Sequence, residues 1–220
     1  MHLSLNIAKY IDHTNLKPYA TYKDIEKLCQ EAVEYQFHAV CVNPFYVSFA
    51  KQQLKNRSVK VCSVVGFPLG ANLLKTKLLE ATLACQDGAD ELDIVWNISA
   101  FKSKDYSYVE NELKTIVQYT EKCIHKIIVE TAYLNHDEKV TAVKIVKNSG
   151  AEFIKTSTGF APKGATVEDV KLFKSLAGEQ LKVKASGGIR DYKTALAMIK
   201  AGADRIGTSH GLNIIRNIRS

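Results

Sequence analysis

Gly-Ala-Asp-Glu-Leu-Asp-Ile-Val at residues 88–95 is one of three related stretches that decide how this chain folds. The others are Gly-Ala-Glu-Phe-Ile-Lys from residue 150 and Gly-Ala-Asp-Arg-Ile-Gly from residue 202. Each follows a segment with helical periodicity and leads into a short apolar segment. Because glycine readily adopts the left-handed conformation that closes a helix, each triplet predicts a loop running from a helix into a strand.

Working outward from these stretches, eight short segments have the composition of buried strands. They cover residues 10–14, 39–42, 60–65, 91–96, 126–131, 153–156, 182–186 and 204–207. Between them lie segments whose apolar residues recur on one helical face. These helical segments are represented by Ile25, Leu28, Cys29, Ala32 and Val33, and by residues 73–85, 140–146, 167–176 and 192–199.

Strands that alternate with helices predict a parallel α/β sheet. Eight units within 220 residues favour a closed (β/α)8 TIM barrel over an open doubly wound sheet. No Gly-x-Gly-x-x-Gly motif follows the first strand, which also disfavours a dinucleotide-binding fold. We therefore expect one barrel domain covering residues 1–220.

The composition limits which binding partners and which cellular compartment we expect for this protein. With 46% apolar and 24% charged residues, the chain resembles an ordinary globular protein. It has no apolar run near the ~20 residues that cross a bilayer, and no secretory signal is visible. The net charge of +7 comes mostly from dispersed lysines without interleaved aromatics. We expect a cytoplasmic protein with an anionic small substrate, or simply a lysine-rich surface, rather than a nucleic-acid or membrane partner.

The cysteines and histidines predict no metal site. The five cysteines are scattered and never form a Cys-x-x-Cys pair, so we interpret them as buried thiols in a reducing cytosol. The six histidines lack metal-ligand spacing. In the same way, His13 is predicted as part of a hydrogen-bonded rim, and the two thiols within strands as packing residues. These cysteines are Cys29, Cys41, Cys62, Cys85 and Cys123.

Three strands carry ionisable groups that an apolar core would exclude. Alternation along each strand places Asp93, Lys155 and Lys184 opposite apolar neighbours, and therefore inside the barrel near the carboxyl ends of the strands. Buried lysines are rare unless they are paired or functional. The alternative for the lysines is a register one residue away, which would turn both of them outward to water. The alternative for Asp93 is a buried, hydrogen-bonded structural carboxylate.

Two glycine-rich loops follow the last two predicted strands. Ser186-Gly187-Gly188 comes after the seventh, and Gly207-Thr208-Ser209 after the eighth. TIM barrels often bind phosphate in these loops, where backbone N–H groups close on the anion. A Gly-Gly pair is also an ordinary turn, so phosphate binding stays a hypothesis at this point.

Taken together, the motifs resemble deoxyribose-phosphate aldolase, a family of class I, Schiff-base aldolases, over nearly the whole chain. The most specific pair is Ile-Lys-Thr-Ser-Thr-Gly at residues 154–159 with Lys-Ala-Ser-Gly-Gly-Ile-Arg at residues 184–190. Weaker matches are Ile-Asp-His-Thr-Asn-Leu-Lys-Pro from residue 11, Val-Cys-Val-Asn-Pro from residue 40 and Glu-Leu-Asp-Ile-Val-Trp-Asn from residue 91.

The resemblance implies a TIM barrel that cleaves 2-deoxy-D-ribose 5-phosphate into D-glyceraldehyde 3-phosphate and acetaldehyde, in deoxyribonucleoside catabolism. Lys155 would form the Schiff base, and Lys184 with Asp93 would transfer protons. Phosphate would bind at the two glycine-rich loops, and the sugar at neighbouring groups. The implied substrate-binding residues are Asp12, Thr14, Thr158, Gly159, Gly187, Gly188, Gly207 and Ser209. No metal or cofactor is expected, because the imine itself withdraws electrons, and a homodimer is possible.

Two departures from the family pattern concern the phosphate rim and the end of the chain. His210 follows Ser209 where relatives commonly have a small residue, and the sequence ends at Ser220 without the tyrosine-ended tail of some relatives. The alternatives are a Schiff-base aldolase for another phosphorylated aldehyde and a non-catalytic barrel that binds a sugar phosphate. In the aldolase hypotheses, a nearby Lys184 cation and partial burial favour the neutral, nucleophilic amine of Lys155.

Overall fold

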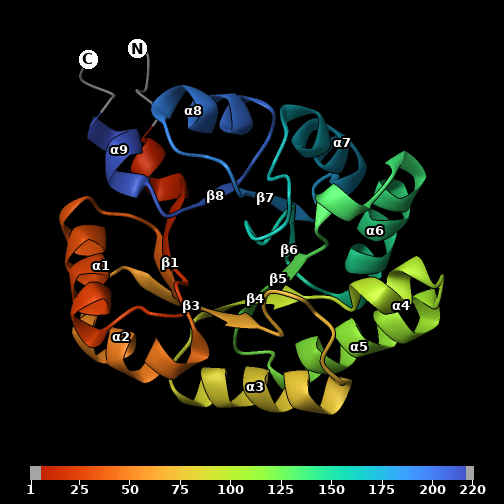
Figure 1. The fold of residues 1–220 in the computed structure, drawn as a ribbon, viewed down its shortest axis with the longest axis horizontal. Coiled ribbons are helices and arrows are strands. Elements are labelled where there is room, and N and C mark those ends of the chain that lie inside the picture. Colours follow the sequence, from red (N-terminus) through yellow and green to blue (C-terminus); the bar gives the residue numbers. More distant parts are fainter. Residues whose placement is uncertain (1–5, 217–220) are drawn as a thin grey trace.

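Eight parallel strands form a closed barrel in the computed structural model, which describes residues 6–216 (Figure 1). Each strand pairs with the next along the chain, and the last pairs with the first. The strands are β1 (Ile11–Asn15), β2 (Ala39–Val42), β3 (Lys60–Val65), β4 (Glu91–Val95), β5 (Ile124–Ile128), β6 (Phe153–Lys155), β7 (Lys182–Ser186) and β8 (Arg205–Thr208). The predicted (β/α)8 barrel is confirmed.

Helices surround the barrel as an outer ring, seen end-on in Figure 1. They are α1 (Tyr22–Glu34), α2 (Val47–Gln53), α3 (Leu74–Gln86), α4 (Ile98–Lys102), α5 (Tyr106–Tyr119), α6 (His136–Ser149), α7 (Val167–Ala177), α8 (Tyr192–Lys200) and α9 (Gly211–Arg216). Short 3-10 helices cover Ile7–Tyr10, Pro44–Tyr46 and Thr131–Tyr133. None of the helices in the described part of the chain is long and apolar enough to span a membrane.

The Gly-Ala-Asp repeats act as helix-to-strand loops, as predicted. Gly88, Gly150 and Gly202 have φ angles of 103°, 84° and 109°, in the left-handed region. The acid of each triplet accepts a hydrogen bond from the backbone N–H of a neighbouring strand: Asp90 from Val61, at 2.9 Å, Glu152 from His125, at 2.7 Å, and Asp204 from Val183, at 2.9 Å. The repeat therefore joins three helix ends to the starts of β3, β5 and β7.

In two of these loops a lysine side chain packs against the glycine and binds the acidic residue. Lys51 binds Asp90 and Lys174 binds Asp204, each with a closest N–O distance of 2.9 Å. A Cβ at Gly88 or Gly202 would lie 2.8 Å or 2.5 Å from the Cγ of its lysine. Glycine is therefore needed at both positions for close approach as well as for backbone conformation.

Apolar side chains fill the space between the strands and the helices. Leu92, Ile94, Ile154 and Val183 belong to this layer and are fully buried. Their alternating neighbours point the other way, into the barrel. The inward orientation of Asp93, Lys155 and Lys184 is thereby confirmed, and the register shifted by one residue is wrong.

Two details of the sequence prediction are also wrong. The fifth strand begins at Ile124 instead of residue 126 and ends at Ile128, since Glu130 has a left-handed backbone with φ of 54°. Helices α2, α4, α5 and α9 were not among the predicted stretches. Residues 1–5 and 217–220, which the predicted domain and the departure at the chain end include, lie outside the described residues.

The cysteine prediction needs a correction as well. Cys85 at the end of α3 and Cys123 before β5 form a disulfide, so they are not free thiols. Cys29, Cys41 and Cys62 are free and buried, as expected. The two bonded residues are 38 positions apart and are brought together by the packing of the α3–β4 loop near the start of β5, which sequence spacing does not reveal.

Candidate active site

A cavity of about 400 Å³ opens at the carboxyl ends of the strands. Its walls come from the end of β1, from α1, and from the loops after β6, β7 and β8. This is the end at which TIM barrels place their active sites. Lys155 reaches the wall of the cavity, whereas Asp93 and Lys184 lie behind it and are fully buried.

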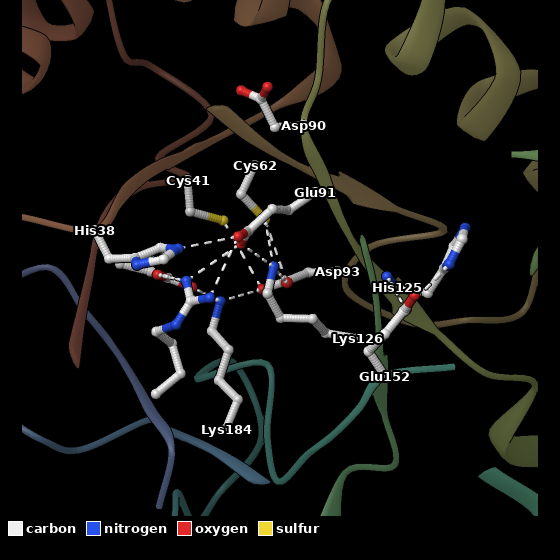
Figure 2. Close-up of polar contacts among 12 residues, drawn as sticks. His38, Cys41, Cys62, Asp90, Glu91, Asp93, His125, Lys126, Glu152 and Lys184 are labelled. Atoms are coloured by element: carbon white, nitrogen blue, oxygen red, sulfur yellow. Dashed lines mark hydrogen bonds and ion pairs between the residues drawn. The ribbon is translucent and has the colours of Figure 1, made fainter. Parts of the chain in front are cut away.

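Asp93 is the centre of the polar network inside the barrel. Its Oδ2 atom accepts from Lys155 Nζ at 2.6 Å and from Lys184 Nζ at 2.7 Å. Its Oδ1 atom accepts from Lys126 Nζ at 2.9 Å. These side chains come from β4, β5, β6 and β7, so only the inside of a closed barrel can bring all four together. Figure 2 shows Asp93 between Lys126 and Lys184.

A second shell of charges continues toward the amino ends of the strands. Asp12 on β1 binds Lys184 at 2.5 Å and Arg205 at 2.7 Å. Glu91 on β4 binds Lys126 at 2.7 Å, Arg205 at 3.3 Å and His38 at 3.2 Å. The barrel interior is thus a continuous ionic network, with every carboxylate shared by at least two cations.

The electrostatic effect of this network has a clear direction. Burial alone would raise the pKa of Asp93, but Lys126, Lys155 and Lys184 outweigh it and hold that pKa well below its usual value. Burial opposes charge on Lys184 too, yet Asp12 and Asp93 raise the pKa of Lys184. Lys184 is therefore held as a cation against the oxygen atom that Lys155 also contacts.

Glu130 supports the cavity wall beside Lys155. It is buried, and its carboxylate accepts hydrogen bonds from both the N–H of Thr158, at 3.2 Å, and the Thr158 hydroxyl. Burial raises the pKa of Glu130, with the Thr158 hydrogen bonds and the charge of Lys155 acting in the opposite direction. Glu130 thereby fixes the position of Thr158, one of the residues lining the cavity.

The glycine-rich loops after β7 and β8 form the adjoining wall of the cavity. Gly187 and Gly188 have φ angles of 84° and 78°, which favour glycine. The loop after β6 crosses this turn closely, since a Cβ at Gly164 would lie 2.2 Å from the carbonyl oxygen of Gly187. The N-terminus of α8 is capped by the Asp191 side chain, which accepts from Thr194 N at 2.8 Å. An anion would therefore be contacted through the loop rather than through that helix end.

Most of the sequence-predicted substrate residues line this cavity: Thr14, Thr158, Gly159, Gly187, Gly188, Gly207 and Ser209. Asp12 does not, because both its oxygen atoms are engaged with Lys184 and Arg205 deeper in the barrel. His13 faces α1 and contacts Glu31 at 2.8 Å, consistent with a rim residue. His210 lines the cavity and lies 3.0 Å from the Ser209 hydroxyl.

Sequence reasoning missed several residues of the site. Lys126, Glu91 and Arg205 follow the same alternation as Lys155, since each has an apolar neighbour facing the helices. The alternation of polar and apolar residues in these strands was therefore enough to predict that all three side chains point into the barrel. Nothing comparable pointed to Glu130, or to the cavity-lining cations Lys17, Lys27 and Arg190.

A family model described as DeoC/LacD family aldolase matches residues 6–217. The chain belongs to this family. Deoxyribose-phosphate aldolase from Thermococcus gammatolerans is 54% identical over 222 residues, which cover 99% of each chain. A solved structure described as QR15, an aldolase, is 53% identical with a TM-score of 0.94, covering 98% of this chain and 96% of that one.

A more distant aldolase structure agrees with these two. Deoxyribose phosphate aldolase from Aeropyrum pernix, described as having a unique tetrameric structure, is 35% identical with a TM-score of 0.91. The match covers 97% of this chain and 91% of that one. The family resemblance predicted from the sequence motifs is confirmed, and the chain is an aldolase.

Proposed function

We propose that this aldolase cleaves 2-deoxy-D-ribose 5-phosphate reversibly into D-glyceraldehyde 3-phosphate and acetaldehyde, through a Schiff base at Lys155, in deoxyribonucleoside catabolism. The observation that carries the proposal is the contact of Lys155 and Lys184 with one oxygen atom of Asp93, directly behind the cavity. The names of the similar proteins support the choice of substrate.

Charge balance favours Lys155 as the nucleophile. Four cationic side chains, those of Lys126, Lys155, Lys184 and Arg205, share ion pairs with three carboxylates, those of Asp12, Glu91 and Asp93. Lys155 is also the lysine with a single carboxylate partner, whereas Lys126 and Lys184 each contact two.

The neutral Lys155 amine attacks the aldehyde carbon of the open-chain sugar, and the resulting carbinolamine loses water to give an iminium ion. Lys184, held as a cation, donates the proton that the leaving hydroxyl needs. The iminium nitrogen formed at Lys155 carries a positive charge, which disfavours the charged form of the neighbouring Lys184. The Lys184 amine then accepts the proton of the sugar 3-hydroxyl as the bond between C2 and C3 breaks.

Cleavage releases glyceraldehyde 3-phosphate and leaves an enamine on Lys155. The proton now on Lys184 returns to the enamine carbon, directly or through a water, and hydrolysis frees acetaldehyde. In this scheme Asp93 is a charge anchor and not a strong base, because its three lysine contacts lower its pKa. It keeps Lys155 and Lys184 oriented toward the same reacting carbon.

Trapping of the imine tests the proposal. Borohydride added with substrate should attach a reduced acetaldehyde or sugar adduct to Lys155, located by peptide mass spectrometry. Without substrate, no adduct should form. An adduct on a different lysine would reject the assignment, and products other than glyceraldehyde 3-phosphate would favour an aldolase for another phosphorylated aldehyde.

The phosphate end of the cavity has a separate test. Ser209 lines the cavity in the loop after β8, the strand next to the one that leads into Gly187 and Gly188. In a Ser209→Asp variant the added carboxylate should repel phosphate, raising KM for 2-deoxyribose 5-phosphate about 100-fold while changing activity on unphosphorylated deoxyribose much less. Equal losses on both sugars would contradict phosphate contact at this rim.

Assembly and location belong to the same proposal. A homodimer in the cytoplasm is proposed, and a relative described as tetrameric supports assembly of the chain. Light scattering of the purified chain measures its mass in solution. A monomeric mass, or recovery from a membrane or secreted fraction of its cells, would contradict this part.

A further inference from the structure

Cys41 and Cys62 form a buried pair of thiols beside the Asp93 carboxylate. They are direct register partners on β2 and β3. Their sulfur atoms and an oxygen of Asp93 all lie within 4.8 Å of one another. Cys62 donates to Asp93 Oδ1 at 3.2 Å, and Cys41 Sγ lies 4.0 Å from Oδ2. Figure 2 shows both sulfur atoms turned toward the ionic network.

Two thiols and a carboxylate are also a donor set for a soft metal ion, but the surroundings oppose a cation here. Lys126 Nζ lies 3.4 Å from Cys62 Sγ and 2.9 Å from Asp93, and two further ammonium groups contact the same carboxylate. A divalent ion within bonding distance of these ligands would lie close to three positive charges. These surroundings favour a reaction of the two thiols that adds no positive charge over the binding of a metal ion.

Disulfide formation is helped when one thiol has a lower pKa than the other, and Cys41 and Cys62 differ in this way. The neighbouring Cys62 thiol and the charges of Lys184 and Lys155 lower the pKa of Cys41, while burial and the charge of Asp93 act in the opposite direction. Burial raises the pKa of Cys62 well above its usual value. Cys41 is therefore the more readily ionised of the two thiols.

We propose that Cys41 and Cys62 are a redox modification site at which hydrogen peroxide forms an intramolecular disulfide and reversibly lowers aldolase activity. The Cys41 thiolate attacks one peroxide oxygen, giving a sulfenic acid and hydroxide. The Cys62 sulfur then displaces the sulfenic hydroxyl, and two thiols with one peroxide yield one disulfide and two waters. The oxidant accepts the two electrons that the sulfur atoms lose.

Leu16 separates the thiols from the cavity, since it packs against the cluster of Cys41, Cys62 and Val64 and also lines the cavity. Peroxide therefore reaches Cys41 when the Leu16 side chain moves aside. Disulfide formation removes the hydrogen bond from Cys62 to Asp93 and draws the two sulfur atoms together. The fall in turnover rests on the proposed role of Asp93, whereas the disulfide itself does not depend on the proposed reaction.

The experiment treats the purified full-length enzyme with hydrogen peroxide, without prior reduction, so that the Cys85–Cys123 bond is retained. Peptide mass spectrometry should show a loss of two hydrogens and a link between the peptides of Cys41 and Cys62. The number of free thiols should fall from three to one, and kcat should fall at least about fivefold. Dithiothreitol should restore it, and bound substrate should slow the reaction.

Matched variants separate this site from general oxidation. Cys29→Ser removes a buried thiol on α1 whose pKa burial raises to about 12, and its activity should remain peroxide-sensitive. Cys41→Ser, compared with its own untreated sample, should resist peroxide. Cys62→Ser should form no link, and its Cys41 should be oxidised to sulfenic and then sulfinic acid instead. They also show whether dithiothreitol acts through Cys85–Cys123.

Three outcomes would overturn the proposal: no link between the two peptides, stepwise oxidation of Cys41 to sulfinic acid without a disulfide, or a complete disulfide with unchanged kcat. If the link forms and Lys155 cannot be trapped with borohydride, the modification site stands and the proposed reaction fails. These results are independent because mass spectrometry detects the link without any assay of turnover.

Discussion

Two regions of this barrel bury lysine against carboxylate, with opposite electrostatic results. Outside the barrel, Lys77 on α3 binds Glu112 on α5 at 3.0 Å, and both side chains are fully buried. Inside, Lys126, Lys155 and Lys184 surround Asp93. In the outer pair burial dominates, lowering the pKa of Lys77 and raising that of Glu112. In the inner network opposite charges dominate, lowering the pKa of Asp93 and raising that of Lys184.

The difference comes from the number of partners that each charge has. Glu112 has one cationic partner, Lys77, and a backbone N–H from Asn97 at 3.0 Å. Inside the barrel each carboxylate contacts at least two cations. A buried lysine is thus no sign of catalysis by itself. What distinguishes Lys155 is an excess of cations around it combined with contact to the cavity.

The largest expected effect on activity comes from removing the Lys155 amine. Lys155→Ala should lower kcat by about 10⁴-fold or more and abolish borohydride trapping, since no other group can form the imine. The matched outer variant, Lys77→Met, should keep kcat per folded molecule near that of the parent. Steady-state kinetics on both variants make the comparison, and a similar loss in the two would remove the distinction between the regions.

The outer pair should show its importance in stability. Lys77→Met leaves the Glu112 carboxylate buried without its cation and should lower the free energy of unfolding by about 3–5 kcal/mol. Adding Glu112→Leu removes the stranded charge and should recover most of that loss. Urea unfolding measures both variants. If the double variant is no more stable than the single one, the cost lies in packing instead of charge.

A smaller effect on activity is expected from Lys126, which binds Asp93 from the side away from the reacting lysine. Lys126→Met should lower kcat about 10- to 100-fold by releasing the Asp93 carboxylate, while borohydride still labels Lys155. Lys126→Arg should restore part of the loss because it keeps the positive charge. A change confined to KM would show that Lys126 does not position Asp93.

The smallest effect is in how stability depends on pH, and here the two regions should differ in sign. The charges of Lys184 and Arg205 outweigh burial and lower the pKa of Asp12 below 3.8, so its stabilisation is present above that pH and lost as the pH falls. Burial raises the pKa of Glu112 above 4.5, so its contribution is present below pH 4.5 and lost as the pH rises.

These signs can be measured by urea unfolding between pH 3 and pH 7. Relative to the parent, Asp12→Asn should lose less stability between about pH 5 and pH 3, and Glu112→Gln should lose less between about pH 5 and pH 7. Parallel curves for the parent and both variants would mean that neither carboxylate has a shifted pKa in the folded protein.

The sequence predicted the inward side chains Asp93, Lys155 and Lys184 because alternation along a strand is a local property of the backbone. The same reasoning applied to Lys126 and Arg205 would have found them. It placed the start of β5 at Lys126 and missed Ile124 and His125, where the polar His125 interrupts the apolar pattern. In the structure both side chains are hydrogen-bonded, since His125 Nε2 lies 2.8 Å from the Thr120 hydroxyl and Lys126 donates to Asp93.

Local patterns were enough for the barrel, for the face on which each strand residue lies and, through its motifs, for the aldolase family. They could not decide contacts between strands far apart in the chain. Asp12 and Arg205, 193 residues apart, meet only when β1 closes on β8. The pairing of Cys85 with Cys123 and the position of Cys41 beside Cys62 and Asp93 depend on the packing of neighbouring strands and loops. Tertiary structure decides all of these contacts, because it places side chains by their distance in space and not by their separation in sequence.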